Sequence, residues 1–77
     1  MTKLQFQELE NNLVFNLNTI YSLEDKIAEE EQNNGTTPLF YRLDAVYNEL
    51  TEGYNTELKI YANYCDNNNI TDCKVNY

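Results

Sequence analysis

Apolar residues in the first 31 positions recur at the spacing of an α-helix, and this pattern constrains the fold more than any other feature. At about 100° per residue they fall within about 120° of one another, on one stripe of an amphipathic helix. The stripe consists of Phe6, Leu9, Leu13, Leu17, Ile20, Leu23 and Ile27. Thr2 followed by Gln5 matches a capping box, which predicts a helix start at residue 3. We therefore expect a helix over about residues 3–31.

The polar segment "QNNGTT" at residues 32–37 separates this stripe from a second one. Gly35 suits the left-handed residue that follows many helices, and Thr37 with Pro38 suits the start of the next helix. The second stripe consists of Leu39, Phe40, Leu43, Val46, Tyr47, Leu50, Tyr54, Leu58, Tyr61, Tyr64 and Cys65. We expect a turn over 32–37, a second helix over about 38–65 and an irregular tail over 66–77.

Two long helices joined by a short turn predict an all-α fold, an antiparallel two-helix hairpin that forms a single domain of residues 1–77. If the turn centres near residue 35, residue i lies beside about residue 70 − i, which places Phe6 near Tyr64. A chain of 77 residues buries only about 60% of its unfolded surface, so its core is thin. Because two helices cannot cover both stripes, we also expect a homodimer, in which two hairpins form a four-helix bundle.

Three tyrosines, Tyr47, Tyr54 and Tyr61, are spaced by sevens and form a nearly axial line on the second helix. Three interpretations stay open. The rings can pack at the edge of the chain's own core with their hydroxyls in water, they can form the seam of a homodimer, or they can bind a different protein. Tyrosine is enriched at protein interfaces, so all three are candidate partner-binding residues.

Further candidates are residues that do not fit the stripes. Phe15 lies nearly opposite the apolar stripe of the first helix, and an exposed phenylalanine often marks a contact. Glu57 interrupts the second stripe and is either solvated at its edge or awaits a cationic group from a partner. Gly53 also interrupts it, and weakens the helix by about 1 kcal/mol relative to alanine, so it marks a bend or a close helix approach.

Acidic residues dominate the charge. Thirteen acids against five bases give a net charge of −8. Such a chain is repelled by nucleic acid and anionic membranes and attracted to basic protein surfaces. Asp44, Glu49 and Glu52 point away from the second stripe and form an acidic helical face. We expect a protein partner with a basic surface, without direct nucleic-acid or membrane binding.

Location is predicted from the absence of two patterns. The first residues lack a basic-then-apolar leader pattern, and no apolar run approaches the roughly 18 residues of a membrane span. We therefore expect a cytoplasmic protein. Cys65 and Cys73 are then expected as free thiols, although they would close a small loop in an oxidising compartment.

Catalysis is not expected. The chain has no histidine, and Ser22 is its only serine, so a histidine-based triad or a histidine metal site cannot form. Two cysteines alone cannot complete a structural zinc site. We predict no enzyme activity, no catalytic residue, no cofactor and no metal.

Binding is thus the predicted function. The leading hypothesis is a small acidic inhibitor or modulator of a host protein, such as a nucleic-acid-processing or defence factor. It would present a negatively charged helical surface in the manner of a DNA mimic. The alternative is a structural or assembly protein that forms a helical bundle with itself or with a larger complex. A small-ligand pocket between bundle helices is a third interpretation.

Overall fold

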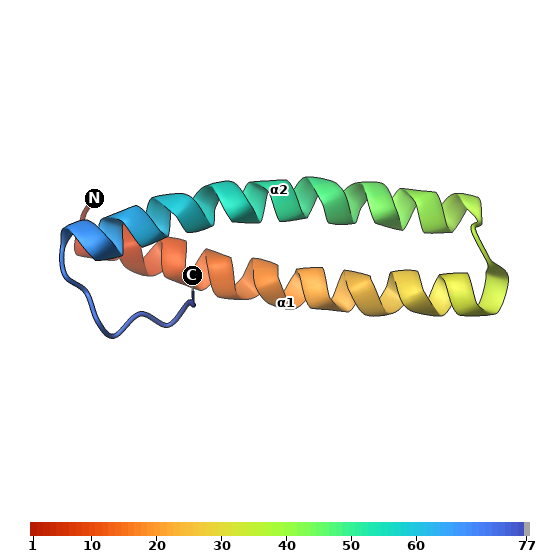
Figure 1. Ribbon diagram of the computed structural model, residues 1–77, viewed down its shortest axis with the longest axis horizontal. Coiled ribbons are helices and arrows are strands. Elements are labelled where there is room, and N and C mark those ends of the chain that lie inside the picture. The colour runs from red at the N-terminus through yellow and green to blue at the C-terminus, as the bar shows by residue number, and fades with distance from the viewer. Residues whose placement is uncertain (77) are drawn as a thin grey trace.

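The computed structural model describes residues 1–76 and contains two long antiparallel helices (Figure 1). Helix α1 spans Lys3–Asn34 and helix α2 spans Pro38–Asn67, and both continue slightly beyond their expected ends. The molecule is a rod of 48 × 18 × 17 Å. The predicted all-α antiparallel hairpin is confirmed, and the described residues contain no strand. Dimerisation into a four-helix bundle stays a prediction.

Both helices begin at the residues that the local signals predict, and α1 ends immediately before Gly35, the residue predicted to follow it. The Thr2 hydroxyl accepts a hydrogen bond from the Gln5 backbone N–H at 3.1 Å, and the Gln5 side chain accepts one from Thr2 N–H at 2.9 Å. Gly35 has φ 78°, a conformation that favours glycine, and ends α1. Thr37 caps α2 by accepting from Phe40 N–H at 3.2 Å.

The turn is fixed by side chains as well as by caps. The Thr37 hydroxyl donates to the Glu30 carboxylate at 2.5 Å, and the Asn34 amide donates to the other Glu30 oxygen at 2.8 Å. These two hydrogen bonds lower the pKa of Glu30, with Thr37 making the larger contribution. Glu30 therefore ties the end of α1 to the start of α2.

The register of the two helices is set by aromatic and polar pairs along the rod. The ring of Phe6 stacks on that of Tyr61 at a centroid distance of 5.1 Å and contacts the ring of Tyr64 at 5.1 Å. Farther toward the turn, the Tyr47 hydroxyl donates to Glu24 at 2.8 Å. The predicted pairing of Phe6 with Tyr64 is confirmed.

The tail that follows α2 folds back along the hairpin at the end remote from the turn (Figure 1). Asn69 has φ 55°, and the next N–H, of Ile70, donates to the Cys65 carbonyl at 3.0 Å. Farther along, Val75 is buried against the helices. The tail thus forms a third layer over part of the rod; its last residue, Tyr77, lies outside the described residues.

Buried side chains are confined to the part of the rod that the tail covers. The hydrophobic core consists of Leu13, Ile20, Tyr54, Tyr61, Cys65 and Val75. All six lie in residues 1–20 or 54–76, which we call the tail half. The turn half, residues 21–53, is fully described and contains no buried side chain. The core is therefore complete at one end of the rod and open at the other.

Candidate functional site

The tyrosine line faces mainly the chain's own first helix. Tyr61 is fully buried and Tyr54 is 8% exposed, so a single chain already covers most of both rings. Tyr47, in the turn half, is half-buried and its hydroxyl bonds to Glu24 near the surface. Of the three, Tyr47 has the most surface left to offer. Contact of any of them with a partner stays a prediction.

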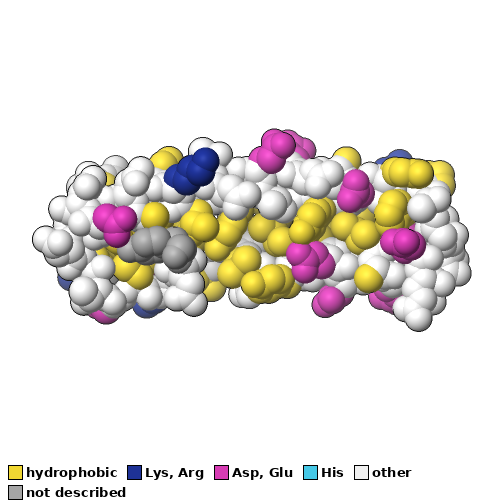
Figure 2. All heavy atoms as spheres, viewed as in Figure 1, with side chains coloured by type: hydrophobic (Ala, Val, Ile, Leu, Met, Phe, Trp, Pro, Cys, Tyr) yellow, Lys and Arg dark blue, Asp and Glu magenta, His cyan; other side chains and the backbone are white. Residues whose placement is uncertain are grey.

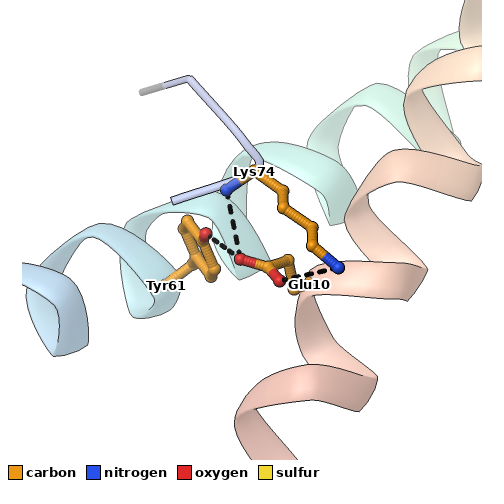
Figure 3. A network of polar contacts seen from close by, with 3 residues as sticks. All are labelled: Glu10, Tyr61 and Lys74. Carbon is orange, nitrogen blue, oxygen red and sulfur yellow. Dashed lines mark hydrogen bonds and ion pairs between the residues drawn. The ribbon is translucent and has the colours of Figure 1, made fainter. Parts of the chain in front are cut away.

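Tyr61 belongs to a buried network that joins both helices to the tail (Figure 3). Its hydroxyl donates to Glu10 at 2.5 Å, and the backbone N–H of Lys74 donates to the same carboxylate oxygen at 3.2 Å. The Lys74 ammonium lies 4.0 Å from the other oxygen. Burial, and then the bond to Glu10, raise the pKa of Tyr61 well above its usual value. The network fastens the tail to the hairpin.

Glu10 was not among the residues predicted from sequence, although a signal was present. It lies four positions after Phe6 and three before Leu13, which places it at the edge of the apolar stripe. A charged residue at that spacing is buried only when it is paired. Glu10 is 5% exposed, and its partners come from α2 and from the tail. This carboxylate is used internally and is not available to a basic partner.

The predicted acidic face lies in the turn half. Glu49 and Glu52 are exposed and Asp44 is half-buried. Eight of the thirteen acids and two of the five bases fall within residues 21–53, so this half carries −6 of the net −8. Figure 2 shows acidic side chains gathered toward the turn end of one face. Phe15 is 70% exposed but lies on α1 outside this half.

Three predicted site residues, Glu49, Tyr54 and Glu57, meet in a shallow cavity near the middle of the rod, which we call the central groove. Its volume is about 340 Å³. Its lining residues are Asn16, Val46, Glu49, Leu50, Gly53, Tyr54 and Glu57. A Cβ added at Gly53 would meet nothing within 4 Å, so the interpretation of this glycine as a close helix approach is wrong. The groove combines apolar walls with two carboxylates.

Glu57 has an incomplete environment in this groove. The side chain is half-buried, and its Oε2 atom is enclosed without a hydrogen-bond donor from any described residue. An enclosed polar atom without a partner costs about 1–3 kcal/mol, and more when it is charged. The two interpretations made from sequence, a carboxylate that is solvated at the edge of the stripe and one that a cationic group from a partner completes, both stay open.

A second cavity, of about 370 Å³, lies nearer the turn. Leu39 and Leu43 of α2 line it together with Glu29 and Glu30 of α1. Leu39 and Val46 are seven residues apart, so they lie on one side of α2, and they are 50% and 49% exposed. Apolar surface bordered by carboxylates thus extends from the central groove toward the turn.

The described part of the chain contains neither a metal-binding cluster nor a helix that could span a membrane. Within residues 1–76, no three His, Cys, Asp or Glu side chains are grouped so that they would hold a metal ion. Neither helix there combines the length and the apolar content that crossing a membrane would require.

Comparisons with known proteins add no relative. No protein-family model matches this sequence, and no curated protein or solved structure resembles it at a significant level.

Proposed function

We propose that this chain is a small protein-binding protein, an inhibitor or modulator that binds a basic helical segment of its target through the turn half and the central groove, which lies where the turn half meets the tail half. The observation that carries the proposal is the enclosed, unpaired Oε2 atom of Glu57 in the central groove. A lysine or arginine from a partner would supply the missing donor. Charge-assisted hydrogen bonds of that kind are about twice as strong as neutral ones.

Charge supports a basic partner over a second copy of this chain. The turn half carries a net charge of −6, and Glu49 lines the same groove as Glu57. Two such surfaces brought together would repel each other, whereas a basic segment would be attracted and oriented by them.

Exposed apolar side chains support an amphipathic helix as the form of that segment. Leu39 and Val46 are half exposed on one side of α2, and the turn half buries none of its side chains. A helix laid along this side would cover these residues with its apolar face, and its basic residues would reach Glu49 and Glu57. This partner helix would form a third layer over the turn half, as the tail does over the tail half.

Inhibition follows if the basic segment normally binds nucleic acid. Carboxylates on a rigid rod would then occupy a surface that is shaped to attract phosphates. This is the DNA-mimic hypothesis. It places Glu49 at the contact, while Asp44 and Glu52, on other sides of α2, add to the negative potential that attracts the partner.

The test uses a synthetic amphipathic helical peptide of lysine and leucine as a probe, with affinity measured by fluorescence anisotropy at low and moderate salt. We expect the triple variant Asp44→Lys, Glu49→Lys, Glu52→Lys to lose at least about tenfold in affinity. The matched control, Glu8→Lys, Asp66→Lys, Asp72→Lys, changes the net charge equally in the tail half and should lose much less. Equal losses in both variants, or a loss in neither, would contradict the proposal.

A single substitution tests the role of the Glu57 carboxylate by itself. Glu57→Gln keeps the size of the side chain and removes its charge, whereas Glu8→Gln does the same on an exposed part of α1. We expect Glu57→Gln to weaken peptide binding several-fold and Glu8→Gln to leave it nearly unchanged. Unchanged affinity in Glu57→Gln would remove this carboxylate from the proposed contact.

Self-assembly into a four-helix bundle is the second candidate function, and the open core of the turn half favours it. It requires a dimer in solution, strengthened by salt because screening weakens the repulsion of the two acidic surfaces. Light scattering at low and moderate salt separates the two proposals. A dimer that Leu39→Ser with Val46→Ser converts to a monomer supports assembly, and a monomer at both salt concentrations supports binding of another protein.

A further inference from the structure

Two cysteine thiols lie in contact at the base of the tail. Cys65, near the end of α2, is 1% exposed, and Cys73, in the tail, is half-buried. Their Sγ atoms are 2.9 Å apart, and both residues are thiols in this structure. The two cysteines are eight positions apart, and the segment between them includes the turn at Asn69 that reverses the chain. Little side-chain movement separates this arrangement from that of a disulfide.

We infer that Cys65 and Cys73 form a redox-responsive pair that a low-molecular-weight disulfide, such as oxidised glutathione, converts to an intramolecular disulfide. The product fastens the tail covalently to the end of α2. The inference rests on the tail half alone and is independent of the function proposed for the turn half.

The reaction begins at the more exposed thiol. The Cys73 thiolate attacks one sulfur of oxidised glutathione, which breaks the glutathione disulfide, releases one glutathione thiolate and leaves a mixed disulfide on Cys73. The Cys65 thiolate then attacks Sγ of Cys73 and expels the second glutathione thiolate. The two protons lost by the protein thiols pass through water to the two glutathione thiolates. In sum, the two cysteines are oxidised and one glutathione disulfide is reduced to two thiols.

The different environments of the two thiols explain why Cys73 reacts first and Cys65 second. Burial, and then the contact with Cys73, raise the pKa of Cys65 to about 11, so this thiol is protonated and shielded from reagents in bulk water. It is poorly placed to start the exchange. Its sulfur is already beside Cys73, however, so the second step is intramolecular and does not depend on access from solvent.

The bond would change how firmly the tail covers the hairpin. In the reduced protein the tail is held by the Ile70 N–H bond to Cys65, by the Lys74 contacts with Glu10 and by burial of Val75. A disulfide closes the loop before Lys74 and limits how far the residues after it can move. The oxidised form should therefore resist both local opening of the tail and global unfolding.

The test treats the purified full-length chain with a series of oxidised and reduced glutathione mixtures and reads the product by intact mass. We expect a monomer lighter by two hydrogen atoms and without a glutathione adduct. The melting temperature of this product should exceed that of the reduced chain by about 10 °C, as expected for a short closed loop in a domain of this size. Trypsin should cut the bond after Lys74 at least about fivefold more slowly in the oxidised form.

Two variants separate the steps. Cys65→Ala keeps the exposed thiol without its neighbour and should accumulate the mixed disulfide on Cys73. Cys73→Ser keeps only the buried thiol and should stay unmodified under the same conditions. The wild-type reaction needs no substitution, so the inference is tested even if a variant folds poorly. Persistent thiols in oxidised glutathione, a stable glutathione adduct on the wild type, or disulfide-linked dimers would each overturn it.

Discussion

The two ends of the rod share the same helices and differ in what covers them. In the tail half, residues 70–76 lie over the hairpin, and Leu13 and Tyr61 lose all contact with solvent. Among the described residues no third segment covers the turn half, and Ile27 and Leu43 stay half-buried although they occupy positions in the apolar stripes similar to those of Leu13 and Tyr61. Two antiparallel helices therefore define a register but do not complete a core. A third layer is needed, and this chain supplies it at one end.

A hydrogen bond between a tyrosine and a glutamate occurs once in each half, so its two environments can be compared directly. Glu10 accepts the hydroxyl of Tyr61 in the tail half, and Glu24 accepts that of Tyr47 in the turn half, at positions fourteen residues apart on each helix. The first pair is buried and the second is exposed. Burial is the main cause of the raised pKa of Tyr61, whereas the bond to Glu24 is the main cause for Tyr47. The contribution of each pair to stability therefore depends on whether the tail covers it, and not on the hydrogen bond alone.

The largest expected difference between the halves comes from leucine truncation. Leu13→Ala should lower the free energy of unfolding by about 3 kcal/mol, because it removes a fully buried side chain and leaves a cavity. Leu23→Ala, on the same helix, should lower it by about 1 kcal/mol, because that side chain is half-exposed. Urea unfolding of the two variants measures both values. Equal losses would mean that the turn half is packed as tightly as the tail half.

The repeated tyrosine contact offers a second, smaller difference. Tyr61→Phe should destabilise the protein by about 2 kcal/mol, because it takes a hydrogen-bond donor from the buried carboxylate of Glu10. Tyr47→Phe should cost much less, because water replaces the hydroxyl at the exposed carboxylate of Glu24. Thermal unfolding resolves this difference. A larger cost for Tyr47→Phe would contradict the comparison.

Alkaline pH should weaken the tail half. Below the ordinary thiol pKa of 9.0, Cys65 is protonated in both folded and unfolded chains, so its contribution to stability is complete. Between there and about 11 the unfolded chain releases this proton while the folded chain keeps it, and stability falls. The free energy of unfolding should drop by roughly 1–2 kcal/mol across this range under reducing conditions. Urea unfolding of wild type and Cys65→Ala at each pH measures the drop, which should be smaller in the variant.

The smallest expected effect has the opposite sign. Gly53→Ala should stabilise the protein by about 0.5–1 kcal/mol, because alanine favours the helix and its Cβ meets no neighbour within 4 Å. Circular dichroism during thermal unfolding measures the gain. A loss of stability would show that this side of α2 is more crowded than the open groove implies.

Much of the fold could be predicted from local signals, and five of the six core residues lie in the predicted stripes, but the contribution of the tail to the core could not be predicted. The caps at Thr2 and Thr37 and the left-handed Gly35 depend on neighbours within a few residues, so sequence reveals them directly. The tail's position depends on contacts between Glu10 and Lys74, which are 64 residues apart. No local pattern near either residue predicts that pairing.

The candidate site divides in the same way. Glu49, Glu52 and Phe15 were predicted on exposed helix faces and are exposed, because helical period alone determines the face. Packing of Tyr54 and Tyr61 against the chain's own core was one of three open interpretations, but it placed the hydroxyls in water, whereas Tyr61 is fully buried and its hydroxyl bonds to Glu10. Helical period cannot distinguish the edge of a core from its centre when the segment that covers it is unknown.

Amide hydrogen exchange on the isolated, reduced protein tests the division into a covered half and an open half most directly. Free energies of local opening rise with the number of buried contacts that must break. We predict that helical amides of residues 9–20 and 54–65 exchange far more slowly than those of residues 21–31 and 40–53. Uniform protection along both helices would show that the turn half is complete without a partner, and would contradict this account.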